Sequence, residues 1–173
     1  MTLTLDTARL ILRRPEPADA AAFLAYTGSE RYRRERGDRP LPEQWNYFAA
    51  LMGHWEIRGY GRFLVCLRDG GTIIGHVGPL YPEGWPEREI AWHLWSDAAE
   101  GKGYAHEAAR AARDHAFQTL GWDTAVSYIA PDNARSRALA ARLGARIDTD
   151  AAQLPYPDKP SVVYRHPRPE ARP

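Results

Sequence analysis

The stretch Glu100-Gly101-Lys102-Gly103-Tyr104-Ala105 has residue types and spacing suited to holding an anion. It precedes a long amphipathic segment, so it lies where a helix is predicted to begin. Backbone N–H groups at a helix start have no intrahelical partner, and the helix dipole attracts negative charge. Glycines at 101 and 103 let the backbone approach a phosphate without a Cβ atom in the way. The sequence therefore predicts a pyrophosphate-type site here, with ordinary turn and capping glycines as the alternative.

Two well-known phosphate motifs do not describe this loop. A Walker loop needs the pattern G-x-x-x-x-G-K-[ST], whereas Lys102 stands between the two glycines. A Rossmann fingerprint has a third glycine and belongs to a βαβ unit. The strands predicted before this loop instead form an antiparallel meander, so a dinucleotide-binding fold is not expected.

A second segment, Pro131-Asp132-Asn133-Ala134-Arg135-Ser136, opens another predicted helix. Asn133 is suited to cap the free N–H groups of its first turn. Ser136 shares a helix face with Leu139 and Leu143, because spacings of three and seven residues lie on one side of a helix. A hydroxyl on an inward face needs a partner. Ser136 therefore either bonds the backbone at the cap or faces a ligand between the two helices.

Hydrophobic periodicity and turn residues place these segments within a mixed α/β fold. Expected strands cover residues 3–13, 59–68, 72–80, 88–96, 124–130, 145–149 and 161–166, and expected helices cover 17–26, 41–58, 104–120 and 134–143. The arginine-rich stretch 28–40 is expected to be a loop, and Trp45 is expected in the core. The order predicts one sheet with helices packed on it, in a single domain over 1–173 with a frayed tail from 167 to 173.

The bulk composition is typical of a globular chain. The 173 residues are 44% hydrophobic and 26% charged, with a formal net charge of +1, which gives no bulk argument for nucleic acid or a membrane surface as a partner. The one cysteine, Cys66, lies in an apolar run and is interpreted as a buried structural thiol. The N-terminus lacks a signal-peptide pattern, no apolar run approaches the ~20 residues of a membrane span, and the histidines lack metal-ligand spacing. A cytoplasmic protein without a metal is the expectation.

Three blocks in series, EIAWHL, EGKGYAHEA and PDNARSRALAARLGA, resemble the GNAT acetyltransferase pattern in content and spacing. The resemblance covers residues 3–166, and in detail it is similar to the RimJ/RimL-like branch, whose loop commonly reads W-G-K-G-Y-A and whose later helix carries N-x-x-S. It implies the GNAT-like acyl-CoA N-acyltransferase fold, with a central, mostly antiparallel sheet that splays apart at the cofactor site. It also implies transfer of an acetyl group from acetyl-CoA to a primary amine, on a protein N-terminus or a small molecule, in a ternary complex.

The resemblance also implies where acetyl-CoA binds. Its pyrophosphate would rest on the backbone amides of Gly101, Lys102, Gly103, Tyr104 and Ala105. Its pantetheine arm would run beside His93, Leu94 and Trp95 as an extra strand would, where this strand and the strand 124–130 separate. Asn133 would bond the pantetheine or the attacking region, and Ser136 would lie near the thioester sulfur.

Two positions depart from the family pattern. The arginine or glutamine that commonly opens the phosphate loop is Glu100 here, and a carboxylate beside a pyrophosphate is unfavourable unless it points away. The tyrosine that protonates the departing thiolate in many relatives falls at Ala140, which has no proton to donate. Ser136 is therefore the candidate proton donor, since the RimJ/RimL-like branch also carries a serine earlier in that helix.

The reaction needs a base, because only a neutral amine has a lone pair for attack. Glu89 is the first candidate, since strand alternation places it on one face with His93, and a glutamate in this place sits beside the acceptor in the resembling branch. A solvated strand-edge carboxylate is the alternative. His93 and His76 are further candidates, because histidine titrates near neutrality, although lone histidines are often structural.

Two other functions fit parts of the pattern. A non-catalytic acyl-CoA-binding or sensing protein on the same fold would account for Glu100 and Ala140. A nucleotide- or sugar-phosphate-binding enzyme would account for the glycine loop alone. The arginines of 28–40 are interpreted as a solvated face or as a border of the acceptor site. A homodimer is expected from the resembling branch, whose members often pair.

Overall fold

The computed structural model describes residues 3–169, which form one mixed sheet flanked by helices. Within that range the strands lie in the order β1-β2-β3-β4-β5-β6-β8-β7, and every neighbouring pair is antiparallel except β5 with β6. The strands are β1 (Thr4–Asp6), β2 (Leu10–Arg13), β3 (Phe63–Leu67), β4 (Ile73–Leu80), β5 (Glu89–Leu94), β6 (Val126–Ile129), β7 (Arg146–Ile147) and β8 (Val162–Arg165). The expected mixed, mostly antiparallel sheet is confirmed.

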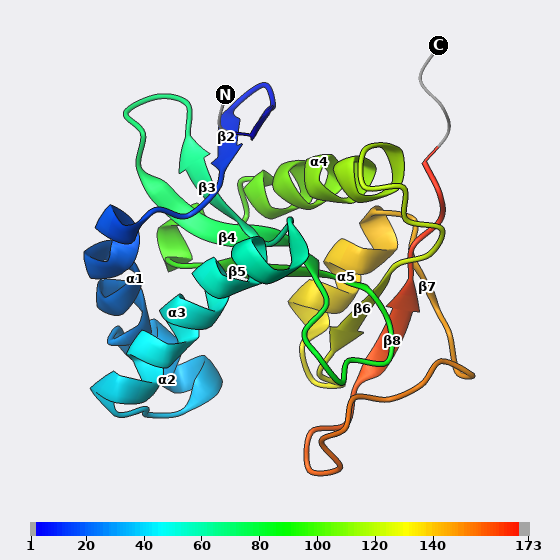
Figure 1. Cartoon of the computed structure of the whole chain (residues 1–173). Helices are drawn as coiled ribbons and strands as arrows, with labels where there is room; N and C mark the ends of the chain where they lie inside the picture. The colour runs from blue at the N-terminus through cyan, green and yellow to red at the C-terminus, as the bar shows by residue number, and fades with distance from the viewer. Residues whose placement is uncertain (1–2, 170–173) are drawn as a thin grey trace.

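Helices cover both faces of this sheet (Figure 1). They are α1 (Ala20–Thr27), α2 (Glu30–Arg36), α3 (Leu41–Arg58), α4 (Tyr104–Gln118) and α5 (Ala134–Arg142), with short 3₁₀ helices at Pro17–Asp19 and Asp97–Ala99. An aromatic cluster around Phe23 and Trp95 joins α1 and α3 to one face. Because side chains alternate along β5, Trp92 and Leu94 point to the other face, where α4 packs.

Two segments differ from the expectations. The predicted strand 3–13 is a hairpin of β1 and β2, because Thr7 turns the chain: its N–H donates to the Leu10 carbonyl (3.0 Å) and its hydroxyl accepts from the Leu10 N–H (3.0 Å). The predicted loop 28–40 contains α2, whose first turn is capped by Ser29 Oγ, which accepts from the Tyr32 N–H (3.2 Å). Arg31 and Tyr32 are buried, so this stretch is not a solvated face throughout.

The buried face of α3 is also shifted from the predicted one. Trp45 was expected in the core, but it is 53% exposed, so that prediction is wrong. Phe48 and Trp55 anchor the helix, and Gln44 is buried four residues before Phe48. The Gln44 side chain accepts from the Thr27 hydroxyl (2.8 Å) and donates to a backbone carbonyl, which satisfies its polar atoms in the interior.

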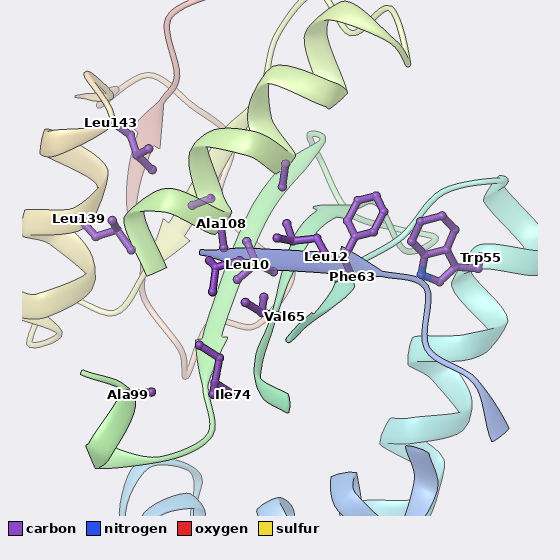
Figure 2. Packing of buried hydrophobic residues seen from close by; sticks show 13 residues of the cluster. Leu10, Leu12, Trp55, Phe63, Val65, Ile74, Ala99, Ala108, Leu139 and Leu143 are labelled. Atoms are coloured by element: carbon purple, nitrogen blue, oxygen red, sulfur yellow. The ribbon is translucent and has the colours of Figure 1, made fainter. Parts of the chain in front are cut away.

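The main core lies between the sheet and α4 (Figure 2). Leucines of β2 pack with Phe63 and Val65 of β3, and the small side chain of Ala108 lets α4 approach the sheet closely. Leu139 and Leu143 extend this core from α5, as Figure 2 shows. Cys66 is buried as expected, and burial raises the pKa of its thiol. The packing fixes the start of α4 beside the end of β5.

The parallel strands β5 and β6 separate along their length. Their register contains the single pair Glu89↔Val126. At that end the Ser127 hydroxyl donates to the Ile90 carbonyl (2.6 Å), which ties the two strands together. The strands part beyond this pair, so the sheet opens towards their carboxyl ends, beside the start of α4.

Candidate active site

The loop before α4 leaves backbone amides available at the positive end of the helix. Gly101 (φ 71°) and Gly103 (φ 81°) adopt left-handed conformations that favour glycine. The first bond within α4 runs from the Glu107 N–H to the Gly103 carbonyl (3.0 Å), so the N–H groups of Tyr104 and Ala105 precede it. Gly103 has no side chain with which to cap them. The amides and the helix dipole together suit an anion.

The N-terminal hairpin holds this loop in place. Arg9 Nη1 donates to the Lys102 carbonyl (2.9 Å), and Arg9 pairs with Glu107 (2.7 Å). The Arg9 guanidinium also lies 4.7 Å from the centroid of the Tyr104 ring. The Thr7 hydroxyl donates to Glu107 (2.6 Å) across a hundred positions of sequence. No local pattern reveals such contacts, and they fix the loop between β5 and α4 against the hairpin.

Glu100 points to two arginines. Arg31 Nη2 lies 2.6 Å from one carboxylate oxygen, and Arg135 pairs with the other. Arg31 is 9% exposed and also pairs with Asp97. Positive charge at this distance offsets the repulsion that a carboxylate exerts on a phosphate. The departure at Glu100 therefore comes with compensating cations, one of them from the stretch expected to be a loop.

β5 presents alternate backbone groups to the gap beside β6. The Trp95 N–H donates to the Ile74 carbonyl (2.8 Å), so the odd-numbered residues, His93 included, turn their backbone groups towards β4. The even-numbered residues face the other way, and the Leu94 carbonyl accepts there from Arg31 Nε (3.2 Å). Within the predicted stretch 93–95, Leu94 is thus the residue whose backbone faces the gap.

Asn133 and Ser136 lie at the start of α5. Asn133 Oδ1 accepts from the Ser136 N–H (3.0 Å), which confirms the predicted cap. This bond uses only the amide oxygen, so the NH₂ group of Asn133 can donate to another partner. Ser136 Oγ accepts from Trp92 Nε1 (3.1 Å), a partner that the sequence analysis did not assign. Because this bond uses an oxygen lone pair, the hydroxyl hydrogen of Ser136 can serve a second partner. Ala140, one turn further along, is fully buried.

Glu89 is buried rather than solvated. It is 7% exposed, and its Oε2 accepts from Trp85 Nε1 (2.9 Å). Burial raises the pKa of the carboxyl to about 6, against the opposing effects of the Trp85 hydrogen bond and the positive charge of Arg62. Such a carboxyl is ionised at neutral pH and still basic enough to accept a proton, which suits a general base.

The two histidine candidates have different surroundings. His76 is fully buried, and Trp95 Nε1 donates to its Nδ1 (2.8 Å), so its Nε2 carries the hydrogen that the Tyr47 oxygen accepts (3.1 Å). His93 is partly exposed, and Arg36 Nη2 lies 3.1 Å from its Nδ1. Burial and nearby arginine charge hold the pKa of both imidazoles well below the usual value, so both rings are neutral. His76 is structural, whereas His93 borders a cavity.

This cavity has a volume of about 390 Å³ and lies between β5 and the helices α1 to α3. Its walls include Tyr26, Tyr32, Tyr47, Arg36, Arg39 and His93. Glu89 lies on the same face of β5 as His93, four residues or about 13 Å along the strand, and does not line this cavity. A cavity of this size and polarity suits a small polar molecule.

Comparisons with known proteins agree with this geometry. Residues 9–146 match the family model described as "Acetyltransferase (GNAT) domain". The crystal structure of the acetyltransferase from Agrobacterium tumefaciens str. C58 is similar at 37% sequence identity and a TM-score of 0.86, over 97% of this chain and 96% of that chain. The uncharacterized N-acetyltransferase YnaD of Bacillus subtilis (strain 168) is 26% identical over 142 residues, which is 82% of each protein.

The chain belongs to the GNAT acetyltransferase family. It is therefore an acyltransferase, and the expected fold and enzyme class are confirmed. Two less similar acetyltransferase structures share the fold alone. The ribosomal-protein-S5-alanine acetyltransferase from Vibrio fischeri is 16% identical with a TM-score of 0.71 over 99% of this chain and 100% of that one. The microcin C7 self-immunity acetyltransferase MccE, in complex with acetyl-CoA and AMP, is 14% identical with a TM-score of 0.71 over 92% of each.

Two further features of this GNAT chain concern residues 3–169. No helix in that range combines the length and apolar character of a membrane span. The same residues contain no cluster of three or more His, Cys, Asp or Glu side chains suited to a metal ion. The predicted tail begins at Pro167, and its last four residues, 170–173, lie outside the described part of the chain.

Proposed function

We propose that this GNAT acetyltransferase moves an acetyl group from acetyl-CoA to a primary amine, by direct attack of the amine on the thioester in a ternary complex. The observation that carries the proposal is the placement of three groups around the gap between β5 and β6. The amides of α4 lie at its open end, the Ser136 hydroxyl lies at its α5 side, and the buried Glu89 carboxyl lies on the opposite face of β5. These groups supply an anion site, an acid and a base.

The cofactor half of the proposal rests on the loop before α4. The backbone of residues 101–105 supplies donors for a pyrophosphate, with Leu94 as the strand edge and Asn133 as an amide donor for the pantetheine arm. MccE, which shares the fold, is seen with acetyl-CoA. Acetyl-CoA at about 100 times its dissociation constant is expected to add about 2.7 kcal/mol and raise the unfolding temperature by several degrees, whereas ATP is not. No rise with millimolar acetyl-CoA would contradict this half.

The chemical half of the proposal assigns one proton transfer to each side of the gap. Glu89 accepts a proton from the amine, whose nitrogen forms a bond to the thioester carbonyl carbon while the carbon–sulfur bond breaks. The Ser136 hydroxyl gives its hydrogen to the departing sulfur, with Trp92 Nε1 holding the oxygen in place. Ser136 then regains a proton from water and Glu89 releases its proton to water, so both groups return to their starting states. Holding both substrates together supplies much of the rate through positioning.

Release of the CoA thiol in the presence of a panel of primary amines tests this chemistry. Glu89→Gln is expected to lower kcat/KM by roughly 10²- to 10⁴-fold, and Ser136→Ala by less, because a thiolate is a good leaving group. Glu83→Gln is the matched control, since that side chain is 97% exposed. Acetyl-CoA binding without thiol release for any amine would instead favour a sensing protein.

The acceptor is a protein N-terminus or a small amine. Membership of the RimJ/RimL-like branch, a homodimer, a cytoplasmic location and a single domain over residues 1–173 remain predictions from the sequence. Size-exclusion chromatography with light scattering measures the oligomeric state. A monomer at micromolar concentration would contradict the homodimer.

A further inference from the structure

Arg62, the residue before β3, is a buried cation without an acidic partner among residues 3–169. It is 7% exposed, its Nη1 donates to the Tyr47 hydroxyl (3.1 Å), and its guanidinium lies 5.4 Å from the centroid of the Tyr47 ring. Arg31 and Arg113 are buried to a similar degree, and each has a carboxylate oxygen within 2.8 Å. Among the ion pairs of residues 3–169, Arg62 takes part in none.

An unpaired buried guanidinium is costly. Arginine stays protonated in proteins, so it cannot escape the cost of burial by losing its charge. Buried charges are accordingly paired or hydrogen-bonded in most proteins. One hydrogen bond to Tyr47 uses one of the five N–H donors of Arg62. The remaining donors are suited to an anion that arrives with a ligand.

Arg62 and Glu89 lie on the same face of the sheet, with Gly78 and Ala91 forming the floor between them. Phe63 pairs with Val77, so Arg62 lies beside Gly78, and a Cβ at Gly78 would meet Arg62 Cα at 3.2 Å. Gly78 pairs in turn with Ala91 of β5, which lies between Glu89 and His93 on the same face. Two strand spacings of about 4.8 Å separate Arg62 from Ala91. Gly78 and Ala91 therefore place no large side chain on this face of the sheet between the cation and the carboxyl.

The groups around this floor favour an anion over a second cation. The Tyr47 hydroxyl accepts from both His76 Nε2 and Arg62, so its own hydrogen is left to donate. Arg36, which contacts His93, adds positive charge at the cavity. The charge of Arg39, by contrast, is neutralised by its ion pair with Glu43 of α3. Glu89 is the nearby carboxyl beside which the amine of the acceptor would lie.

The geometry points to an acceptor amine that carries a carboxylate, held by Arg62 and Tyr47 while its amine lies beside Glu89. A guanidinium binds a carboxylate through two parallel hydrogen bonds, which fixes orientation as well as charge. The acceptor class is therefore a small amino acid rather than a simple alkylamine. The inference rests on the proposed function, because it names the substrate of that same site.

Matched acceptors test the inference: free amino acids and the carboxamides of the same amino acids, assayed by thiol release from acetyl-CoA. The wild type is expected to prefer the carboxylates. Arg62→Gln is expected to reduce that preference by roughly 10- to 100-fold, mainly through KM, because a charge-assisted bond is lost. The quantity compared between wild type and variants is the ratio of kcat/KM for the amino acid to kcat/KM for its carboxamide. The difference in amine pKa between the two acceptors cancels in that comparison. Arg68→Gln, an exposed arginine beyond the far end of β3, is the control and is expected to leave the ratio unchanged.

Each outcome decides the inference. An equal loss for both acceptors in Arg62→Gln, or a wild-type preference for the carboxamides, overturns it and leaves the proposed function standing. If the wild type acetylates no amine, the proposed function fails, and thermal stabilisation by N-acetylated amino acids decides the inference instead. Stabilisation of the wild type but not of Arg62→Gln supports the anion site. Stabilisation of neither protein overturns it. If Arg62→Gln does not fold, Arg62→Lys and Tyr47→Phe carry the same comparison.

Discussion

Replacing Glu89 with glutamine tests the base and its burial in one variant. Glutamine has nearly the same shape, and its carbonyl oxygen can still accept from Trp85 Nε1, so the fold is expected to be retained. The wild-type carboxyl has a pKa of about 6 and must be ionised to accept a proton. At a fixed fraction of neutral amine, kcat/KM is expected to be level above pH 6 and to fall about tenfold per pH unit below it. The variant is expected to lose this limb together with roughly 10²- to 10⁴-fold of the plateau.

Glu89→Gln is expected to lower activity but to raise stability at neutral pH relative to the wild type. The pKa of Glu89 is raised from 4.5 to about 6 in the folded state, so its contribution to stability is present below pH 4.5 and is lost as pH rises through 6. The difference of about 1.5 units corresponds to about 2 kcal/mol. Relative to the wild type, Glu89→Gln is therefore expected to gain about 2 kcal/mol between pH 4 and pH 7.

Two measurements check this prediction. Initial rates of thiol release from pH 5 to 8 give the activity profile, and urea unfolding at pH 4 and pH 7 gives the change in stability. Glu83→Gln is the control for both, because its carboxyl is exposed. An activity limb that persists near pH 6 in Glu89→Gln would refute Glu89 as the base. A stability difference that does not change with pH would refute the burial argument.

Three further predictions concern the cofactor loop and the acid stability of the fold. Arg31→Met leaves Glu100 with Arg135 alone, so calorimetry is expected to find acetyl-CoA bound roughly tenfold more weakly, a loss of about 1.4 kcal/mol. Adding Glu100→Gln to Arg31→Met is expected to restore the affinity. Unchanged affinity in Arg31→Met would contradict the idea that Arg31 offsets the charge of Glu100. Gly103→Ala places a side chain at φ 81° with its Cβ 3.3 Å from Arg9, so urea unfolding is expected to show a loss of about 1–2 kcal/mol, and a neutral effect would mean that the loop relaxes freely. Burial and the nearby charge of Arg113 lower the pKa of His166 from 6.5 to about 3, so its contribution to stability is present above pH 6.5 and is lost as pH falls towards 3. His166→Gln is expected to reduce the loss of unfolding free energy on acidification by up to about 1.4 kcal/mol per pH unit. An unchanged dependence of unfolding free energy on pH would refute the role given to His166.

The fold and the glycine loop that begins α4 were predictable because their determinants are local. Periodic alanines define α4, paired glycines define its start, and Asn133 caps α5. The helix α2 was missed, because its seven residues are mostly charged and only Arg31 and Tyr32 face the interior. Burial of an arginine depends on partners elsewhere in the chain, so the sequence pattern did not reveal it.

The chemistry of the site was predictable in part. Glu89 and Ser136 were named from alternation and helix spacing together with the resemblance; Glu89 lies at the end where β5 pairs with β6, Ser136 bonds Trp92 of β5, and their catalytic roles stay predictions. Trp92 as the partner of Ser136, and Arg62 across the floor from Glu89, were not found. Each contact joins strands and helices whose register is set by packing, and sequence spacing carries no information about that register.

Mass spectrometry of the product tests the central claim most directly. Catalytic amounts of the protein would be incubated with acetyl-CoA and an equimolar mixture of amino acids, peptides and simple amines. We expect many turnovers that yield an N-acetylated amine, and roughly 10²- to 10⁴-fold fewer with Glu89→Gln over the same time. Stable binding of acetyl-CoA without any acetylated amine would contradict it and would favour a sensing role for the fold.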